Sequence, residues 1–292
     1  MSIKLSLPIK KNRKAVKRSK AGTIILSLII IILGAFTALP FIYAIIQSFK
    51  PLNEIFIFPP KFYVKEPTTE NYYMLTQLMQ NSLVPISRYF VNSIFVSVAA
   101  TVLHVIVASM AAFPLAKFKF PFHTTINSLI VTTLLFSGTV TTIPRFVLMS
   151  RVGLLDTHLA LILPAVCGSL GVFLMRQFMT QLPDALIEAA RIDGASLNKI
   201  LWKIVFPSVK PAWLTLTVFA FQGIWNTTGT EFIYEEKLKM LPLVLRQLST
   251  SGISQVGVAA ATAVLMMLPP IIVFMLTQTS VMETMTQSGI KE

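Results

Sequence analysis

The chain has 292 residues, of which 54% are hydrophobic and only 13% are charged, and its formal net charge is +13 at pH 7. Soluble domains carry about 25% charged residues, so this composition excludes an ordinary soluble protein and indicates a chain embedded in lipid. The single cysteine, Cys167, excludes an internal disulfide and a cysteine-based metal cluster, and we expect it to be a small buried apolar residue.

The chain begins with a basic tail, residues 1–23, which an apolar run from Ile24 to Ile46 follows. A signal peptide has an apolar core of roughly 7–15 residues and then a small-residue cleavage site. This run is longer and continues through Leu39-Pro40 without such a site. It therefore predicts a retained first membrane-spanning helix, which together with an external loop occupies residues 24–89.

Five further segments approach the roughly 20 apolar residues that a helix needs to cross a bilayer. The six predicted spans are Ile24–Ile46, Phe90–Leu115, Ile126–Leu148, Leu159–Phe178, Pro211–Asn226 and Val256–Leu276. The pattern predicts an all-α membrane protein with six transmembrane helices. Residues 90–279 are its core, and residues 280–292 are a C-terminal tail.

The fifth span is short, and the sixth contains Pro269-Pro270. Proline removes a donor from the helical hydrogen-bond ladder, and lipid tolerates this only where protein or a cavity covers the freed groups. The last two spans are therefore candidates to line a transport path.

Lysine and arginine concentrate in alternate connecting segments, which sets the orientation. The basic tail, the connection at Lys117 and Lys119 and the stretch 179–210 are predicted to be cytoplasmic, as are both termini. The loops 50–88 and 227–255 are predicted to be external. Because this topology accounts for most of the excess positive charge, nothing in the sequence favours a nucleic-acid partner.

The sequence lacks the residues that catalysis or ion coupling would need. It has no G-x-x-x-x-G-K-[ST] phosphate loop, its three histidines are scattered, and no acidic residue falls within a predicted span. Of the titratable groups of a proton relay, only His104 lies at membrane depth, where packing is the commoner role of a lone histidine. We therefore predict no catalytic residue, no metal site and no cofactor in this chain, and an energy source on a partner.

The stretch from Gln181 to Pro211 predicts a helix–turn–helix hairpin. Pro183 and Asp184 suit a first helical turn, Gly194 can end that helix in the left-handed conformation, and Ser196 can cap a second helix that runs to Phe206-Pro207. The small Ala189 and Ala190 would let another body approach closely, with Glu188 as an anchor charge. The spacing alone leaves a docking element and a plain interfacial linker equally open.

The residues Glu188, Ala189, Ala190, Gly194, Ile204 and Pro207 form the pattern E-A-A-x-x-x-G, nine residues, I-x-x-P. This closely resembles the EAA loop of binding-protein-dependent ABC importer permeases, with Phe206 where that family usually has leucine. The stretches 144–164 and 173–178 are similar to the carbohydrate-uptake (maltose-type) branch. The resemblance covers roughly residues 90–278 and implies the type I ABC importer fold.

The resemblance also implies a set of partners. The loop residues Glu188, Ala189, Ala190, Asp193 and Gly194 would seat on an ATPase subunit that binds ATP and Mg²⁺. The assembly would contain two such ATPases, a second, different permease as heterodimer partner, and an extracellular solute-binding protein. It would carry a sugar or oligosaccharide across the cytoplasmic membrane of a bacterium. The acidic Glu231 is displaced from its family position, and Glu283 stands where a glycine is common.

A sugar path needs hydrogen-bonding side chains and aromatic platforms in an otherwise apolar wall. Candidates are Gln222, Trp225 and Asn226 near the outer end of the fifth span and Asn92 in the second. Each has a plainer alternative: helix–helix contacts for Gln222 and Asn226, an interfacial anchor for Trp225, and packing for Asn92.

Three other functions remain as alternatives. An ion-coupled secondary carrier would need an ion site at membrane depth. An intramembrane enzyme would need a catalytic constellation that these residues do not form. A membrane scaffold that transports nothing would show no ATP-dependent uptake.

Overall fold

The computed structural model of the protein describes residues 20–80, 84–136, 138–249 and 255–288, and within these ranges every regular element is helical. The chain forms two units, Met1–Ala44 and Ile45–Glu292. The first holds most of α1 (Lys20–Ser48). The stretch Ala21–Ser48 is long and apolar enough to cross a membrane. At 1.5 Å per residue, α1 is about 44 Å long, which exceeds the roughly 30 Å of a hydrocarbon core.

The second unit contains the remaining helices. In chain order they are α2 (Leu52–Ile55), α3 (Glu70–Gln80), α4 (Ile86–Lys117), α5 (His123–Thr133), α6 (Gly138–Arg151), α7 (Leu159–Val166), α8 (Ser169–Thr180), α9 (Asp184–Ile192), α10 (Leu197–Ile200), the π-helix η1 (Leu201–Val205), α11 (Phe206–Ser208), α12 (Lys210–Trp225), the 3₁₀ helix η2 (Glu236–Leu238), α13 (Leu241–Ser249) and α14 (Val256–Ser288). α14 thus continues past residue 280, where the predicted tail begins. Residues 1–19 of the predicted basic tail lie outside the described ranges.

Four described stretches are long and apolar enough to cross a membrane: Ala21–Ser48, Ile86–Lys117, Leu159–Thr180 and Val256–Gln278. They correspond to the first, second, fourth and sixth predicted spans. Counting each of two bent helix pairs as one span would raise the number to six. The protein is therefore a helical, multi-pass membrane protein.

The third predicted span, Ile126–Leu148, is not one continuous helix. It divides into α5 and α6, which are bent by 108°. The end of α5 explains where the division begins: the amides of Leu134 and Leu135 donate to the carbonyls three residues back, at 3.2 and 3.0 Å. Such short-range bonds tighten and close a helix. They follow the β-branched run 131–133, whose side chains have a low helix propensity.

The fifth predicted span, Pro211–Asn226, corresponds to α12. This helix has only 16 residues, and it makes an angle of 81° with the preceding segment Leu197–Ser208. Val209 stands at the corner with φ −104° and ψ 30°, a non-helical conformation. Pro211 follows it in the first turn of α12, where a missing N–H costs nothing.

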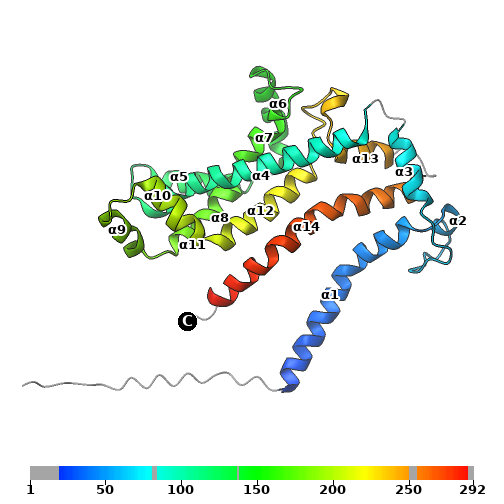
Figure 1. The fold of residues 1–292 in the computed structure, drawn as a ribbon, viewed down its shortest axis with the longest axis horizontal. Helices are drawn as coiled ribbons and strands as arrows, with labels where there is room; N and C mark the ends of the chain where they lie inside the picture. The colour runs from blue at the N-terminus through cyan, green and yellow to red at the C-terminus, as the bar shows by residue number, and fades with distance from the viewer. Residues whose placement is uncertain (1–19, 81–83, 137, 250–254, 289–292) are drawn as a thin grey trace, which may run out of the picture. The chain divides into compact units, whose positions relative to one another are not determined.

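α4 is the central element of the second unit. It packs against α7, α8 and α12, and α12 also packs against α14 (Figure 1). The α4–α8 contact is close because Gly168 and Gly171 face the His104 ring, and a Cβ on Gly171 would collide with the ring atom Nε2. His104 Nδ1 donates to the Val166 carbonyl at 2.9 Å, at the end of α7. His104 is therefore a satisfied packing residue.

The segment between α1 and α4 is tied to the rest of the second unit through α3. The side-chain amide of Asn71 donates to the carbonyls of Ser48 and Lys50, at 2.9 and 2.8 Å. A Cβ at Gly257, in the first turn of α14, would collide with the same Asn71 side chain. The glycine thus allows α3 to lie directly against α14.

Candidate coupling hairpin and substrate path

The stretch predicted as a hairpin begins at α9, which is fixed to the end of α4. Pro183 precedes the helix with φ −61°, and Asp184 occupies its first turn. Lys117, in the last turn of α4, pairs with the Asp184 carboxylate at 2.7 Å and also donates to the Leu182 carbonyl. Both charges complement the dipoles of their own helices. The Lys117 side chain is only 3% exposed, whereas that of Asp184 is 77% exposed, so the bond to the Leu182 carbonyl is the better shielded of the two contacts between α4 and the start of the hairpin.

Gly194 ends α9 in the left-handed conformation, with φ +75°. The amide of Ala195 donates to the Ala190 carbonyl and that of Gly194 to the Arg191 carbonyl, both at 3.0 Å. This pair of bonds is the Schellman motif, which satisfies the last carbonyls of a helix. A Cβ at Gly194 would meet no atom within 4 Å. The position therefore requires glycine for its backbone conformation and not for space.

α9 has one buried and one exposed face. Ile187 and Ala190 are buried in the same cluster as Ile200 and Val205. The other predicted coupling residues are exposed: Glu188, Ala189, Asp193 and Gly194. Ile192 is exposed as well, at 86%, which is unusual for an isoleucine. Four of the five predicted docking residues thus share an exposed surface, whereas Ala190 faces the core and packs the helix instead of presenting a small surface to a partner.

The second half of the hairpin leads into α12. Ser196 caps α10 by accepting the Lys199 amide at 3.4 Å. The chain then passes through the π-helix η1, where Pro207 cannot supply the N–H that the Lys203 carbonyl would receive in an α-helix. Phe206 stacks on Trp213 across the corner, with ring centroids 5.3 Å apart and an interplanar angle of 8°. This stack braces the hairpin against the start of α12.

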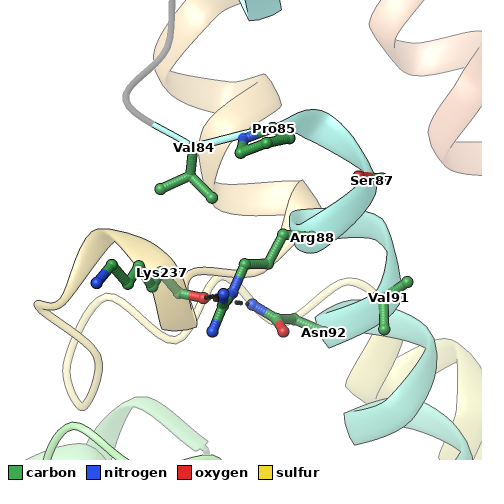
Figure 2. A pocket seen from close by; sticks show the side chains of 7 residues that line it. All are labelled: Val84, Pro85, Ser87, Arg88, Val91, Asn92 and Lys237. Carbon is green, nitrogen blue, oxygen red and sulfur yellow. Dashed lines mark hydrogen bonds between the residues drawn. The ribbon is translucent and has the colours of Figure 1, made fainter.

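Asn92, the candidate path residue in α4, is 8% exposed and binds the loop that precedes α13. Its amide donates to the carbonyls of Lys237 and Lys239, at 2.9 and 3.0 Å. Arg88, one turn earlier, donates from Nε to the same Lys237 carbonyl at 3.2 Å, and Figure 2 shows the two side chains converging there. They border a pocket of 630 Å³ that Val84, Pro85, Ser87, Val91 and Lys237 also line.

Tyr89 and Ser93 extend this contact between α4 and the loop. Tyr89 donates to a Glu236 carboxylate oxygen at 2.9 Å, and Lys239 pairs with the other oxygen. Ser93 accepts the Leu241 amide at 2.8 Å, where α13 begins. Burial raises the pKa of Glu236. Hydrogen bonds from Lys239 and Tyr89 and the charge of Lys239 lower this pKa by more than burial raises it, so it lies below its ordinary value of 4.5.

Replacing Glu236 by glutamine should loosen this loop at neutral pH. We expect hydrogen exchange at the Leu241 amide to become about two- to fivefold faster, because a partly exposed ion pair contributes about 0.2–1 kcal/mol. The pKa of Glu236 is lowered in the folded protein, so the two proteins should differ fully in exchange rate above about pH 4.5. This difference in rate should vanish as the pH falls through the lowered pKa and the carboxylate is protonated. Exchange followed by mass spectrometry measures it, with Glu235→Gln as control. A difference that stays constant as the pH is lowered until the Glu236 carboxylate is protonated would contradict this role.

Trp225 is fully buried between α12, α4 and α14. Its ring stacks on Phe221 at 5.9 Å and meets Phe90 edge-on at 6.4 Å. Its Nε1 donates to the Met266 carbonyl at 2.9 Å. That carbonyl would receive its helical bond from residue 270, but Pro270 has no N–H. The indole therefore covers a backbone group that the prolines of α14 set free.

Gln222 and Asn226 lie on the exposed side of α12, and the Asn226 amide donates to the Gln222 carbonyl at 2.9 Å. Among the pockets found in the described part of the chain, only Asn92 of the four candidate path residues lines one. Asn92 binds the loop, Trp225 binds α14, and the other two remain open to the surroundings. A pathway role for each of them stays a prediction.

Several contacts in this region carry no obvious sequence signal. Asp156, with φ +55°, accepts the amides of Tyr234 and Glu235 at 2.6 and 2.8 Å. Lys117 and Arg88 look from sequence like ordinary charges at the ends of a span. Their partners lie 67 and 149 residues away along the chain, so local patterns cannot reveal them.

A family described as "Binding-protein-dependent transport system inner membrane component" matches residues 88–286, which include the α9–α10 hairpin and the helices on both sides of it. The chain belongs to this family. The predicted family is therefore confirmed, and the protein is an inner-membrane permease subunit of a transport system. The ion-coupled carrier is not favoured.

Two relatives agree with this assignment, and one solved structure shares the fold. The permease is 28% identical to the inner membrane ABC transporter permease protein YcjP of Escherichia coli over 259 residues, which are 87% of this chain and 91% of that protein. It is 34% identical to protein LplC of Bacillus subtilis over 223 residues, 74% and 72% of the two chains. A bacterial ABC transporter that imports the acidic polysaccharide alginate has a similar fold, with a TM-score of 0.73 at 23% identity over 90% of this chain and 98% of that one.

Proposed function

We propose that the permease is one of the two membrane-spanning halves of an ATP-driven importer for a sugar or oligosaccharide, in the cytoplasmic membrane of a bacterium. The observation that carries this proposal is the exposed surface of Glu188, Ala189, Asp193 and Gly194 on α9 and its turn. Relatives support the substrate class: one, YtcP of Bacillus subtilis, is a polygalacturonan/rhamnogalacturonan transport system permease, 32% identical over 72% of this chain.

The hairpin is suited to transmit movement from an ATPase. Its first end is joined to α4 through the Lys117–Asp184 pair, and its second end is braced against α12 by the Phe206–Trp213 stack. A body that binds the exposed face and moves would therefore displace α4 and α12 together. Such rigid-body displacement can exchange an outward for an inward opening. ATP drives the exchange only if it binds one state more tightly than the other.

The proposed assembly follows from this role. It contains six spans in each permease, with both termini of this chain in the cytoplasm, and a second, homologous permease that makes a heterodimer. Two ATPase subunits bind ATP and Mg²⁺, and an extracellular solute-binding protein delivers the sugar. No ATP-binding residue is assigned to the permease itself.

Uptake into vesicles tests the proposal. Right-side-out vesicles that contain the complex, isolated through a tag on this chain, and that are supplied with the solute-binding protein should accumulate labelled oligosaccharide only when ATP is enclosed on the ATPase side. Accumulation should continue when ionophores remove the ion gradients. Uptake that needs no ATPase and stops when the ion gradient is removed would instead identify a secondary carrier. If no uptake occurs under any condition, the protein is a membrane scaffold that transports nothing.

A further inference from the structure

An arginine lines a small pocket between α6 and α7. Arg145 belongs to α6, and the pocket beside it has a volume of 380 Å³. Leu148 and Met149 of α6, Leu163 and Pro164 of α7, and Cys167 form much of its wall. An apolar pocket of a few hundred Å³ with a few polar groups is typical of small-ligand sites.

The position of the pocket along the apolar stretch Leu159–Thr180 places it within the bilayer when that stretch spans the membrane. Leu163 and Cys167 stand four and eight residues after the start of the apolar stretch Leu159–Thr180, or about 6 and 12 Å along its helix. The stretch as a whole is about 33 Å long, so the pocket occupies the half near Leu159, which is the outer half in the proposed orientation. Ionisable residues at such depth mark substrate paths or paired charges.

Arg145 has no carboxylate partner among the described residues. Its Nη2 donates to the Thr141 hydroxyl at 3.1 Å, while the ion pairs found in the described ranges are Lys117–Asp184 and Lys239–Glu236. The guanidinium is exposed and keeps other donors free to bind two oxygens of one anion side by side.

Cys167 was expected to be buried, but it is exposed. It stands between α7 and α8, where the helix is interrupted before Gly168, and its thiol therefore borders the pocket. Since it is the single cysteine of the chain, it can report on the pocket without any engineered residue.

We propose that Arg145 and this pocket bind an anionic oxygen group of the transported saccharide, a carboxylate or a phosphate ester. This inference rests on the proposed import function and narrows its substrate to acidic sugars. The same chemistry could come from the phosphate of a lipid headgroup, and the experiment separates the two sources.

The experiment measures how fast Cys167 reacts with two methanethiosulfonates, the anionic 2-sulfonatoethyl reagent and the cationic 2-(trimethylammonium)ethyl reagent. In each reaction the thiolate forms a disulfide with the reagent and releases methanesulfinate. The complex is held in phosphatidylcholine nanodiscs, and mass spectrometry of the Cys167 peptide excludes cysteines of other subunits. Because both reagents attack the same thiolate, the ratio of their rates does not depend on the thiolate fraction.

The ratio of anionic to cationic rate should fall about tenfold in Arg145→Gln, because Arg145 and Cys167 line the same pocket and the loss of a unit charge changes the local concentrations of the two reagents in opposite directions. Coulomb's law in water gives a combined factor of about ten for charges separated by about 6 Å. Arg145→Lys should keep most of the ratio. Arg151→Gln should leave it unchanged, because Arg151 is exposed at the end of α6 and does not line the pocket. An unchanged ratio in Arg145→Gln would overturn the proposal.

Protection by solutes completes the test. Trigalacturonate should slow modification of Cys167 in wild type and not in Arg145→Gln, whereas the neutral trisaccharide maltotriose should protect neither. Equal protection by both sugars, or protection that follows added phosphatidylglycerol instead of the sugar, would overturn the proposal. ATP-dependent uptake is measured on the same complex. Its absence would refute the import function, whatever Cys167 reports about the pocket.

Discussion

Replacing Glu188 by lysine should lower ATP-dependent uptake at least about tenfold while the permease still inserts and folds. The Glu188 side chain is exposed, and no hydrogen bond or ion pair to it is found in the described ranges, so the change leaves the subunit's own packing intact. Reversing a charge in a docking surface places like charges opposite each other, which costs affinity and coupling. Copurification of the ATPase subunits and uptake into vesicles are the two measurements.

Glu231→Lys is the matched control, because it reverses a charge that is also exposed but lies in the loop between α12 and α13. It should leave both measurements unchanged. Gly194→Trp supplies a second variant: the bulky side chain is strained at φ +75° and would project from the same exposed turn. If Glu188→Lys and Gly194→Trp both retain wild-type copurification and uptake, α9 is not the coupling element.

Replacing Trp225 by phenylalanine should reduce the free energy of unfolding by about 1–3 kcal/mol, the cost of leaving a buried acceptor without its donor. The Met266 carbonyl loses the indole N–H, and Pro270 cannot replace it. Titration with sodium dodecyl sulfate in mixed micelles, followed by circular dichroism, gives the free energy.

Trp213→Phe provides the matched control, because it removes the same ring volume from another tryptophan of α12. The Trp213 Nε1 has no hydrogen-bond partner among the described residues, so its loss should cost less than that of Trp225. Equal destabilisation by the two substitutions would show that ring packing, and not the bond to Met266, stabilises the contact between α12 and α14.

The long apolar segments and the hairpin chemistry were predictable because they are local properties of the chain. A run of about 20 apolar residues requires lipid wherever it occurs, and the first, second, fourth and sixth predicted spans each match a helical stretch. Gly194 adopts its left-handed φ and Ser196 its capping bond within a few residues of sequence. The bend in Ile126–Leu148 was not predicted, because hydropathy averages over a window and does not register where a helix closes.

The sequence by itself determined that this protein is embedded in a membrane and resembles a transport family, and it located the helix end at Gly194. Only the tertiary structure decided what the polar side chains bind. Asn92 donates to the Lys237 carbonyl, 145 residues away along the chain. Trp225 donates to the Met266 carbonyl, 41 residues away, which has no helical partner because residue 270 is a proline. Within an apolar interior each such group must find a partner, and which partner lies within 3 Å depends on how distant helices pack and not on any neighbour in the chain.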